Sequence, residues 1–247
     1  MGEPVGIFAC QIALRRIAAL SLLCCVGLFG HEARAEDGSG GREIVVFGDS
    51  QGQGIAFGLQ RLLLDEPQFK VLNRTHPGAA LVHDEGEWLA PIRKFLASER
   101  ADVAIVMLGA NDRLDMREAG ASLRFRTDAW REEYVRRIDK IMSALTDAGL
   151  KVIWCGNPIA RSDTYSSDMN YINEIYADEA ARFGVQFVPL WSAVVDDGGK
   201  YTAFGKALDG VTQRLRGDDG IHFTAAGYQL IADRIVALIP TLAVNGQ

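Results

Sequence analysis

Short, almost continuously apolar runs alternate along the chain with longer segments in which apolar residues recur every three or four positions. Five runs rich in Val, Ile and Phe predict strands, at residues 43–47, 69–73, 102–109, 151–156 and 185–190. Near-continuous apolarity is typical of parallel strands that are buried on both faces. Between and after the runs, helical spacing predicts helices over residues 54–64, 87–97, 127–148, 168–183 and 224–238.

This alternation of strands and helices predicts one α/β domain with a parallel sheet. Right-handed crossover connections would put helices on both faces of the sheet and make a three-layer α/β/α sandwich. Ligands of such sheets bind beyond the carboxyl ends of the strands. Residues 191–218 follow neither pattern, and their Gly and Asp content predicts a long functional loop.

The N-terminal segment has a different pattern. Two arginines precede an apolar run at residues 17–30, and an A-x-A motif ending at Ala35 follows it. A positive start, a short apolar run and small residues at the exit are typical of a secretory signal peptide cleaved after Ala35. We therefore expect a signal peptide at residues 1–35, a flexible lead at residues 36–42 and export to the bacterial periplasm. Membrane attachment is expected only if the segment stays uncleaved, because the run is short for a membrane span.

Composition narrows the class of protein. With 48% hydrophobic and 23% charged residues, the chain is typical of globular proteins. The formal net charge of −6 and the lack of any Lys/Arg-rich run argue against nucleic acid or an anionic lipid surface as the main partner. Beyond the predicted signal peptide Cys155 is the one cysteine, so no internal disulfide is expected and stability must come from an ordinary core.

Four motifs with reactive or glycine residues follow predicted strands or begin the last predicted helix. Ser50 lies in "FGDSQGQG", Gly78 in "RTHPGAAL" and Asn111 in "LGAND". Asp219 and His222 lie in "DDGIHFTAAGY". Because the carboxyl ends of parallel strands share one edge of the sheet, we expect these residues to meet there.

Each of these residues fits a part that acyl transfer needs. A serine hydroxyl is a poor nucleophile until a base takes its proton, and His222 is the candidate base because imidazole titrates near neutral pH. Asp219, three residues earlier, is placed to orient the ring. The backbone N–H groups of Ser50 and Gly78 and the side-chain amide of Asn111 are candidate donors to an oxyanion.

Simpler interpretations exist for some of these residues. Ser50 could cap the helix that follows it, and Asn111 could belong to an ordinary turn that Asp112 braces. His76 and His83 are rival bases, but neither has an acid three residues before it. Asp218 is a second carboxylate beside Asp219, and the spacing to the histidine favours Asp219. The histidines and carboxylates lack metal-ligand spacing, so we predict neither a metal nor another cofactor.

The motifs carry a resemblance to a known family. "FGDS", the glycine at position 78, "GAND" and "DGIH" occur in the order of the four blocks of SGNH (GDSL-type) hydrolases. The distal segment "GKYTAFGKALDGVTQRLRGDDGIHFTAAGYQLIA" further resembles an exported bacterial subgroup described as DUF459-like. The resemblance implies a flavodoxin-like α/β/α fold, the SGNH hydrolase fold, over residues 43–247. It also implies serine esterase or acyltransferase chemistry without a metal.

The resemblance assigns roles to the same residues. Ser50 corresponds to the nucleophile, and His222 and Asp219 to the base and its acid partner. The family's oxyanion donors correspond to Ser50, Gly78 and Asn111.

Three further residues are candidates for substrate contact. Gln51 stands where the name-giving motif has leucine, and its position next to the nucleophile suggests that it faces the substrate. Arg113 and Arg216 lie near the motifs, where a guanidinium can hold an anionic group such as a uronate or succinyl carboxylate. The alternative for both arginines is a solvated or ion-paired surface role.

These expectations converge on an exported serine esterase. The preferred substrate is an O-acetylated cell-envelope glycan or exopolysaccharide, and a small ester is the simpler possibility. Transfer of the acyl group to a sugar hydroxyl by the same site is an alternative, because the two reactions differ only in whether water or a sugar hydroxyl accepts the acyl group. A non-catalytic glycan-binding protein is another alternative, although such a protein would be expected to lose Ser, Asn or His, and none is lost here.

Overall fold

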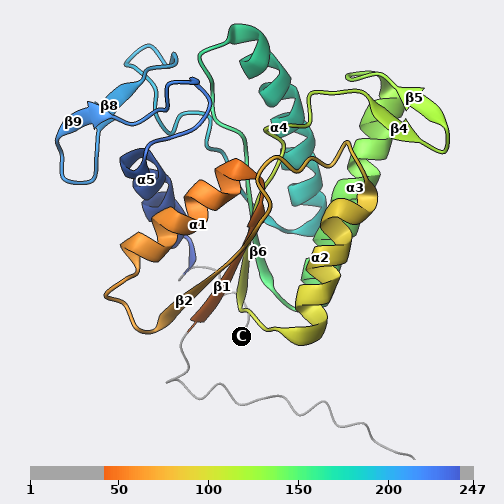
Figure 1. The fold of residues 1–247 in the computed structure, drawn as a ribbon, viewed down its shortest axis with the longest axis horizontal. Helices are drawn as coiled ribbons and strands as arrows, with labels where there is room; N and C mark the ends of the chain where they lie inside the picture. Colours follow the sequence, from red (N-terminus) through yellow and green to blue (C-terminus); the bar gives the residue numbers. More distant parts are fainter. Residues whose placement is uncertain (1–41, 240–247) are drawn as a thin grey trace, which may run out of the picture. The chain divides into compact units, whose positions relative to one another are not determined.

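A computed structural model describes residues 42–239 of the chain (Figure 1). The predicted signal peptide at residues 1–35 lies outside the described residues, and so does the flexible lead except for Arg42. Arg42 is the first residue of the first strand, which begins one residue before the predicted domain boundary.

A five-stranded parallel sheet forms the centre of the fold, in the order β2-β1-β3-β6-β7. The strands are β1 (Arg42–Gly48), β2 (Phe69–Thr75), β3 (Val103–Met107), β6 (Lys151–Cys155) and β7 (Gln186–Val188). All five predicted strands are therefore confirmed. Counted along the chain, this order is the 2-1-3-4-5 order of flavodoxin-like sheets.

Helices cover both faces of the sheet (Figure 1). One layer consists of α1 (Ser50–Leu62) and α5 (Ala225–Val236), which pack on the face formed by Ile44 and Val46. The other layer consists of α2 (Glu85–Ser98), α3 (Asp128–Asp147) and α4 (Asp163–Phe183), which pack on Val45 and Phe47. The predicted three-layer α/β/α sandwich is confirmed. The alternating residues of the central strands β1 and β3 are buried on both sides, as their continuous apolarity predicted, whereas the edge strand β2 is partly exposed.

Polar residues just before the helices determine where the helices start. Each helix has a side-chain oxygen at its N-cap that accepts a hydrogen bond from a backbone N–H of the first turn; the five capping residues are Asp49, Asp84, Thr127, Ser162 and Thr224. With Asp49 as cap, α1 starts at Ser50, four residues before the predicted start. Glycines early in α1 lower its intrinsic helix propensity and hid this first turn from the sequence pattern.

Two of these glycines bring α1 unusually close to α5. A β-carbon on Gly54 would lie 2.0 Å from the ring of Tyr228, and one on Gly58 would lie 2.6 Å from the Tyr228 carbonyl oxygen. No side chain larger than hydrogen fits at either position without moving α5. The backbone of α1 therefore touches the Tyr228 ring at Gly54 and the backbone of α5 at Gly58, close to the end of the last motif.

Two short hairpins were not predicted. Residues 191–218, expected to form a long loop, contain β8 (Phe204–Lys206) and β9 (Thr212–Arg214), and β4 (Met116–Glu118) pairs with β5 (Ala121–Leu123). Each of these strands has only three residues, too few for an alternating pattern to stand out. Within residues 42–239, no helix has the length and apolar character needed to cross a membrane.

Candidate active site

The carboxyl ends of the first three sheet strands come together at one edge. Gly48 at the end of β1 is in register with Thr75 of β2 and with Met107 of β3. The segments that carry Ser50, Gly78 and Asn111 leave the sheet directly after these residues. The order of strands therefore gathers these three motifs, as expected from the sequence.

Ser50 is the first residue of α1, and it is not the helix cap. The cap is Asp49, whose Oδ1 accepts a hydrogen bond of 2.8 Å from the backbone N–H of Gln51. Because the capping role is filled by its neighbour, the hydroxyl of Ser50 is free for another partner. The simpler interpretation of Ser50 as a cap is therefore wrong.

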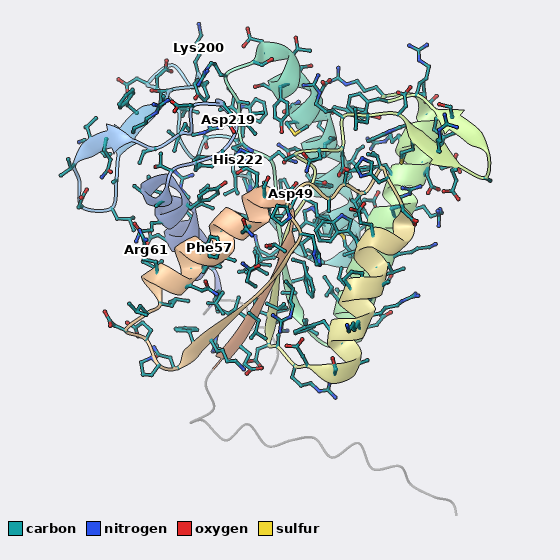
Figure 2. All side chains as sticks on the ribbon, in the orientation of Figure 1. Asp49, Phe57, Arg61, Lys200, Asp219 and His222 are labelled. Carbon is teal, nitrogen blue, oxygen red and sulfur yellow. The ribbon has the colours of Figure 1, made fainter. Side chains whose placement is uncertain are left out.

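The hydroxyl of Ser50 meets the imidazole of His222, which lies 172 positions away in the sequence. Ser50 Oγ lies 2.7 Å from His222 Nε2, and His222 Nδ1 lies 2.5 Å from Asp219 Oδ2. The three side chains thus form a continuous line from hydroxyl to imidazole to carboxylate. Figure 2 shows Asp219 and His222 above the start of α1.

Asp219 is held in place by the turn that it belongs to. Its Oδ1 accepts hydrogen bonds from the backbone N–H groups of Ile221, at 2.8 Å, and His222, at 3.0 Å. Burial alone would raise the pKa of Asp219, but the hydrogen bonds from the His222 ring and from the two backbone groups lower it to about 2. Asp219 is therefore a carboxylate near neutral pH.

The side chain of Asp218 has a different partner from that of Asp219. Its side chain is 89% exposed and forms an ion pair with Arg214. Its backbone oxygen accepts a hydrogen bond of 2.8 Å from Arg161 Nη2. The carboxylate beside His222 is therefore that of Asp219, as the spacing predicted.

On the other side of Ser50, Asn111 contacts the segment that follows Gly78. Asn111 Nδ2 donates a 3.0 Å hydrogen bond to the carbonyl oxygen of Ala79. A side-chain amide has two N–H donors, so a second one is left for a ligand. Gly78 is exposed and has a φ of +84°, in the left-handed region that favours glycine. No atom lies within 4 Å of the place a β-carbon would take, so the space beside Gly78 is open.

Two buried carboxyl groups, both fully shielded from solvent, anchor these loops. Asp49 Oδ2 accepts a 3.1 Å hydrogen bond from the backbone N–H of Ala110, so the residue before Ser50 binds the residue before Asn111. Burial raises the pKa of Asp49 to about 7, although the N–H group of Gln51 acts in the opposite direction. The chemical motifs alone gave no sign of this role for Asp49.

The second buried carboxyl group belongs to Asp112. It accepts hydrogen bonds from the Val82 backbone N–H at 3.2 Å and from the Tyr134 hydroxyl at 2.7 Å. Burial raises its pKa to about 6, and the hydrogen bond from Tyr134 opposes that rise. Asp112 therefore braces the turn after β3, as the sequence suggested.

Gln51 faces the protein interior, which corrects the expectation that it faces the substrate. Its side chain is 2% exposed, and Nε2 donates a 2.9 Å hydrogen bond to the carbonyl oxygen of Ile221. Its Oε1 accepts a 2.8 Å hydrogen bond from the hydroxyl of Tyr228. Gln51 therefore connects the start of α1 to the residue before His222 and to α5.

Arg216 is also buried, so the expected contact with a substrate anion is corrected as well. Its guanidinium lies 4.1 Å from the ring centroid of Phe223 and 5.0 Å from that of Tyr201. Nη2 donates a 3.0 Å hydrogen bond to the Ile221 carbonyl oxygen, which Gln51 also contacts. Burial lowers the pKa of Arg216. The sequence offered no sign that both residues support the turn carrying His222.

Arg113 remains close to the site and partly exposed. Its Nε lies 3.4 Å from Asp168 Oδ2, and its guanidinium lies 5.4 Å from the centroid of the Tyr165 ring. The Tyr165 hydroxyl in turn donates a 2.8 Å hydrogen bond to the carbonyl oxygen of Ala110. Arg113 is therefore ion-paired, and it lies on the Asn111 side of the site.

The rival histidines lie outside the line of three side chains. His76 is exposed and its ring packs edge-on at 6.0 Å from that of Trp88. His83 is exposed and its Nδ1 lies 3.6 Å from Glu87 Oε2. The preference for His222 as the partner of Ser50 agrees with the geometry.

The family described as "Protein of unknown function (DUF459)" matches residues 43–238, nearly all of the described chain. The chain belongs to this family. Among curated proteins, none matches the DUF459 chain by sequence.

Solved structures resemble this DUF459 protein at low sequence identity. A lipolytic G-D-S-L family protein from Veillonella parvula has 15% identity and a TM-score of 0.59, covering 80% of this chain and 98% of that chain. The acetyl xylan esterase AlAXEase has 16% identity and a TM-score of 0.54, covering 80% and 99%. The periplasmic domain of the lipopolysaccharide acetyltransferase of Salmonella ser. Paratyphi A has 15% identity and a TM-score of 0.57, covering 81% and 84%. The DUF459 chain thus has the SGNH hydrolase fold.

Proposed function

We propose that this DUF459 protein is an exported serine esterase that removes acyl groups, chiefly O-acetyl groups, from a cell-envelope glycan or exopolysaccharide. The observation that carries the proposal is the line Ser50–His222–Asp219, with separations of 2.7 and 2.5 Å. Hydrogen bonds of this length join a nucleophile, a base and an orienting acid in serine hydrolases.

The first half-reaction forms an acyl-enzyme. His222 Nε2 takes the proton of the Ser50 hydroxyl while Oγ attacks the ester carbonyl carbon. The carbonyl oxygen becomes an oxyanion, which accepts hydrogen bonds from the N–H groups of Ser50 and Gly78 and from Asn111 Nδ2. The positive end of the α1 dipole also favours negative charge at this point. The protonated His222 then donates its proton to the leaving alcohol, and the acyl group stays on Ser50.

The second half-reaction releases the acid. A water molecule loses a proton to His222 Nε2 and attacks the acyl carbon, and the Ser50 oxygen leaves with that proton. Asp219 stabilises the imidazolium in both steps, because its low pKa keeps it charged. The residues supply all proton transfers, so the proposed steps need no further group.

Export and the glycan substrate rest on separate observations. The arginines, apolar run and A-x-A motif of the first 35 residues support export through a cleaved signal peptide. The structurally similar acetyl xylan esterase and lipopolysaccharide acetyltransferase domain support acetylated carbohydrate as the substrate class. An exported protein meets such glycans at the cell envelope.

Transfer of the acyl group to a sugar hydroxyl is the second candidate function. It is favoured by the structural similarity to an acetyltransferase periplasmic domain. The acyl-enzyme on Ser50 would be the same, and a sugar hydroxyl in place of water would lose its proton to His222. Measuring free acetate against acetylated acceptor, with oligosaccharide added, separates the two reactions.

Hydrolysis of p-nitrophenyl acetate tests the shared chemistry. The wild-type protein is compared with Ser50→Ala and His222→Ala, both expected to lose at least a thousandfold in kcat. A fluorophosphonate probe should label the wild-type protein and fail to label Ser50→Ala. Equal hydrolysis by all three proteins, or equal labelling of wild type and Ser50→Ala, would overturn the assignment of Ser50.

A further inference from the structure

A groove with a volume of about 730 Å³ starts at the catalytic residues and leads away from the oxyanion side. Its lining includes Ser50 and His222 but neither Gly78 nor Asn111. It runs between α1 and α5, so it is continuous with the proposed reaction centre. None of the mechanistic steps described above uses it.

The α1 wall of the groove is one face of the helix. Its side chains are those of Ser50, Gln53, Phe57, Gln60 and Arg61, and Leu64 just beyond the end of α1 extends this wall. Figure 2 shows Phe57 and Arg61 along α1, leading away from His222. At 1.5 Å per helical residue, the eleven steps from Ser50 to Arg61 span about 16 Å. The groove is therefore long enough for an extended chain and not only for one small group.

The position of His222 determines which part of an ester lies in this groove. The oxyanion points toward Gly78 and Asn111, while the oxygen of the leaving alcohol must lie within reach of His222 Nε2 to receive its proton. Since the groove opens at His222 and its lining includes neither Gly78 nor Asn111, it receives the alcohol. The acyl group, small in the proposed reaction, lies outside it.

The lining has the mixture of groups that binds carbohydrate. Phe57 is 56% exposed, although an aromatic side chain in water is normally covered. Gln53 and Gln229 also line the groove, and their side chains make no hydrogen bond to any other residue in the range 42–239. Flat aromatic surface beside free amides suits the faces and hydroxyls of sugar rings better than it suits a hydrocarbon chain.

The distal end of the groove carries one positive charge. Arg61 is exposed, and no carboxylate within residues 42–239 pairs with it. The residues that line the groove include no Asp or Glu. This is an unbalanced cation on a chain whose formal net charge is −6. A guanidinium in this setting favours a carboxylate on the bound molecule.

We propose that this groove binds the alcohol side of the substrate, an extended glycan chain that stacks on Phe57 and presents a carboxylate to Arg61. The proposal rests on the esterase function proposed above and specifies its substrate as a uronate-containing glycan. The scissile ester lies at Ser50, and the charged sugar lies about 16 Å farther along α1.

Binding of unacetylated oligosaccharides tests the groove without requiring turnover. Tetragalacturonate and neutral xylotetraose are titrated into wild type, Phe57→Ala and Arg61→Gln by calorimetry. We expect Phe57→Ala to weaken both sugars about tenfold, and Arg61→Gln to weaken only tetragalacturonate by a similar factor. The midpoint of urea unfolding should stay at the wild-type value in both variants, because both side chains are exposed.

Matched substitutions outside the groove serve as controls. Phe204, at 56% exposed, has the same exposure as Phe57, and Arg93 on α2 is exposed like Arg61. Phe204→Ala and Arg93→Gln should leave both affinities unchanged. The proposal is overturned if neither sugar binds, or if the groove variants bind like wild type.

A series of p-nitrophenyl esters with two to twelve acyl carbons tests an acyl occupant instead. A rate that rises with acyl length and loses that rise in Phe57→Ala would assign the groove to the acyl chain and overturn the proposal. Rates unaffected by Phe57→Ala support it. If wild type binds the sugars as expected but Ser50→Ala does not reduce ester hydrolysis, the esterase proposal fails while the groove assignment stands.

Discussion

The groups on the His222 side of Ser50 and those on its Asn111 side are held in place in different ways. On the His222 side, the reactive groups are side chains in contact with each other, and those of Asp219 and His222 are 47% and 39% exposed. On the Asn111 side, the loops are fixed by carboxyl groups that are fully buried and bind backbone N–H groups. The side chains proposed to transfer protons thus lie near solvent, while the carboxyl groups that hold the loops in position lie in the core.

This difference indicates how substitutions on each side should behave. Changes to Asp219 or His222 should alter the rate of the reaction with little loss of stability, because partly exposed hydrogen bonds contribute little to folding. Changes to the buried anchors of the Asn111 side should alter stability first, because a lost partner leaves a buried polar group unsatisfied. The predictions below test this distinction.

The largest effect is expected for Asp219→Asn. The amide keeps the shape of the side chain but removes the charge that stabilises the imidazolium, so kcat on p-nitrophenyl acetate should fall by about 10³–10⁴. The midpoint of urea unfolding should change little, since the side chain is half exposed. Asp218→Asn, on the neighbouring exposed residue, is the control and should keep full activity. A large loss of stability in Asp219→Asn would contradict the proposed contrast.

Asn111→Ala should have the next largest effect. Removal of one oxyanion donor costs about 10²–10³ in kcat with KM nearly unchanged. Because Asn111 also donates to the Ala79 oxygen, a small loss of stability is expected as well. Steady-state kinetics on p-nitrophenyl acetate separates kcat from KM. A rise in KM with unchanged kcat would show that Asn111 binds the ground state instead of the oxyanion.

Asp49 should make stability depend on pH. Its pKa is about 7 in the folded protein against 3.8 for the ordinary carboxyl, so the folded state holds more protons between these values. The free energy of unfolding should therefore decrease as pH rises from about 4 through 7, by roughly 3 kcal/mol. Asp49→Asn should flatten that slope in urea titrations, leaving the part due to Asp112 below pH about 6. An unchanged slope would contradict the prediction.

Gln51→Leu should have the smallest effect of the four. Leucine removes the hydrogen bonds to the Ile221 oxygen and from the Tyr228 hydroxyl, so stability should fall by about 1–2 kcal/mol. A looser His222 turn should lower kcat by about threefold and leave KM unchanged. Tyr228→Phe, which removes only the hydroxyl, should lower stability without lowering kcat. Equal kcat in Gln51→Leu and wild type would show that Gln51 has only a structural role.

The residues of the proposed catalytic set could be brought together from the sequence because acyl-transfer chemistry restricts residue type and topology restricts position. A serine, a histidine and a carboxylate three residues before it form a recognisable set, and parallel strands bring their ends to one edge. Ser50 and His222, 172 positions apart, meet for this reason. Residues 43–47 and 102–109 were recognisable as strands because β1 and β3 are buried on both faces, whereas residues 69–73 belong to the partly exposed edge strand β2.

The supporting residues could not be predicted in the same way. Gln51 and Arg216 are polar and sit beside reactive motifs, so their types suggested contact with substrate. Their burial depends on the packing of α5 and of the β8–β9 segment, which no local pattern records. Asp49 likewise stands directly before the nucleophile, and its link to the Ala110 N–H forms only when β1 and β3 lie side by side.

Gly54 and Gly58 make part of the sequence intolerant of change although they take no part in the reaction. In a library of all single substitutions scored for function, both positions should be depleted of every alternative, as strongly as the proposed nucleophile Ser50. The space that a side chain would need at each position is occupied by the ring or the backbone of Tyr228. A scan of variants would therefore mark a glycine pair spaced four apart as essential, and only purified protein would reveal that these variants fail in folding and not in turnover.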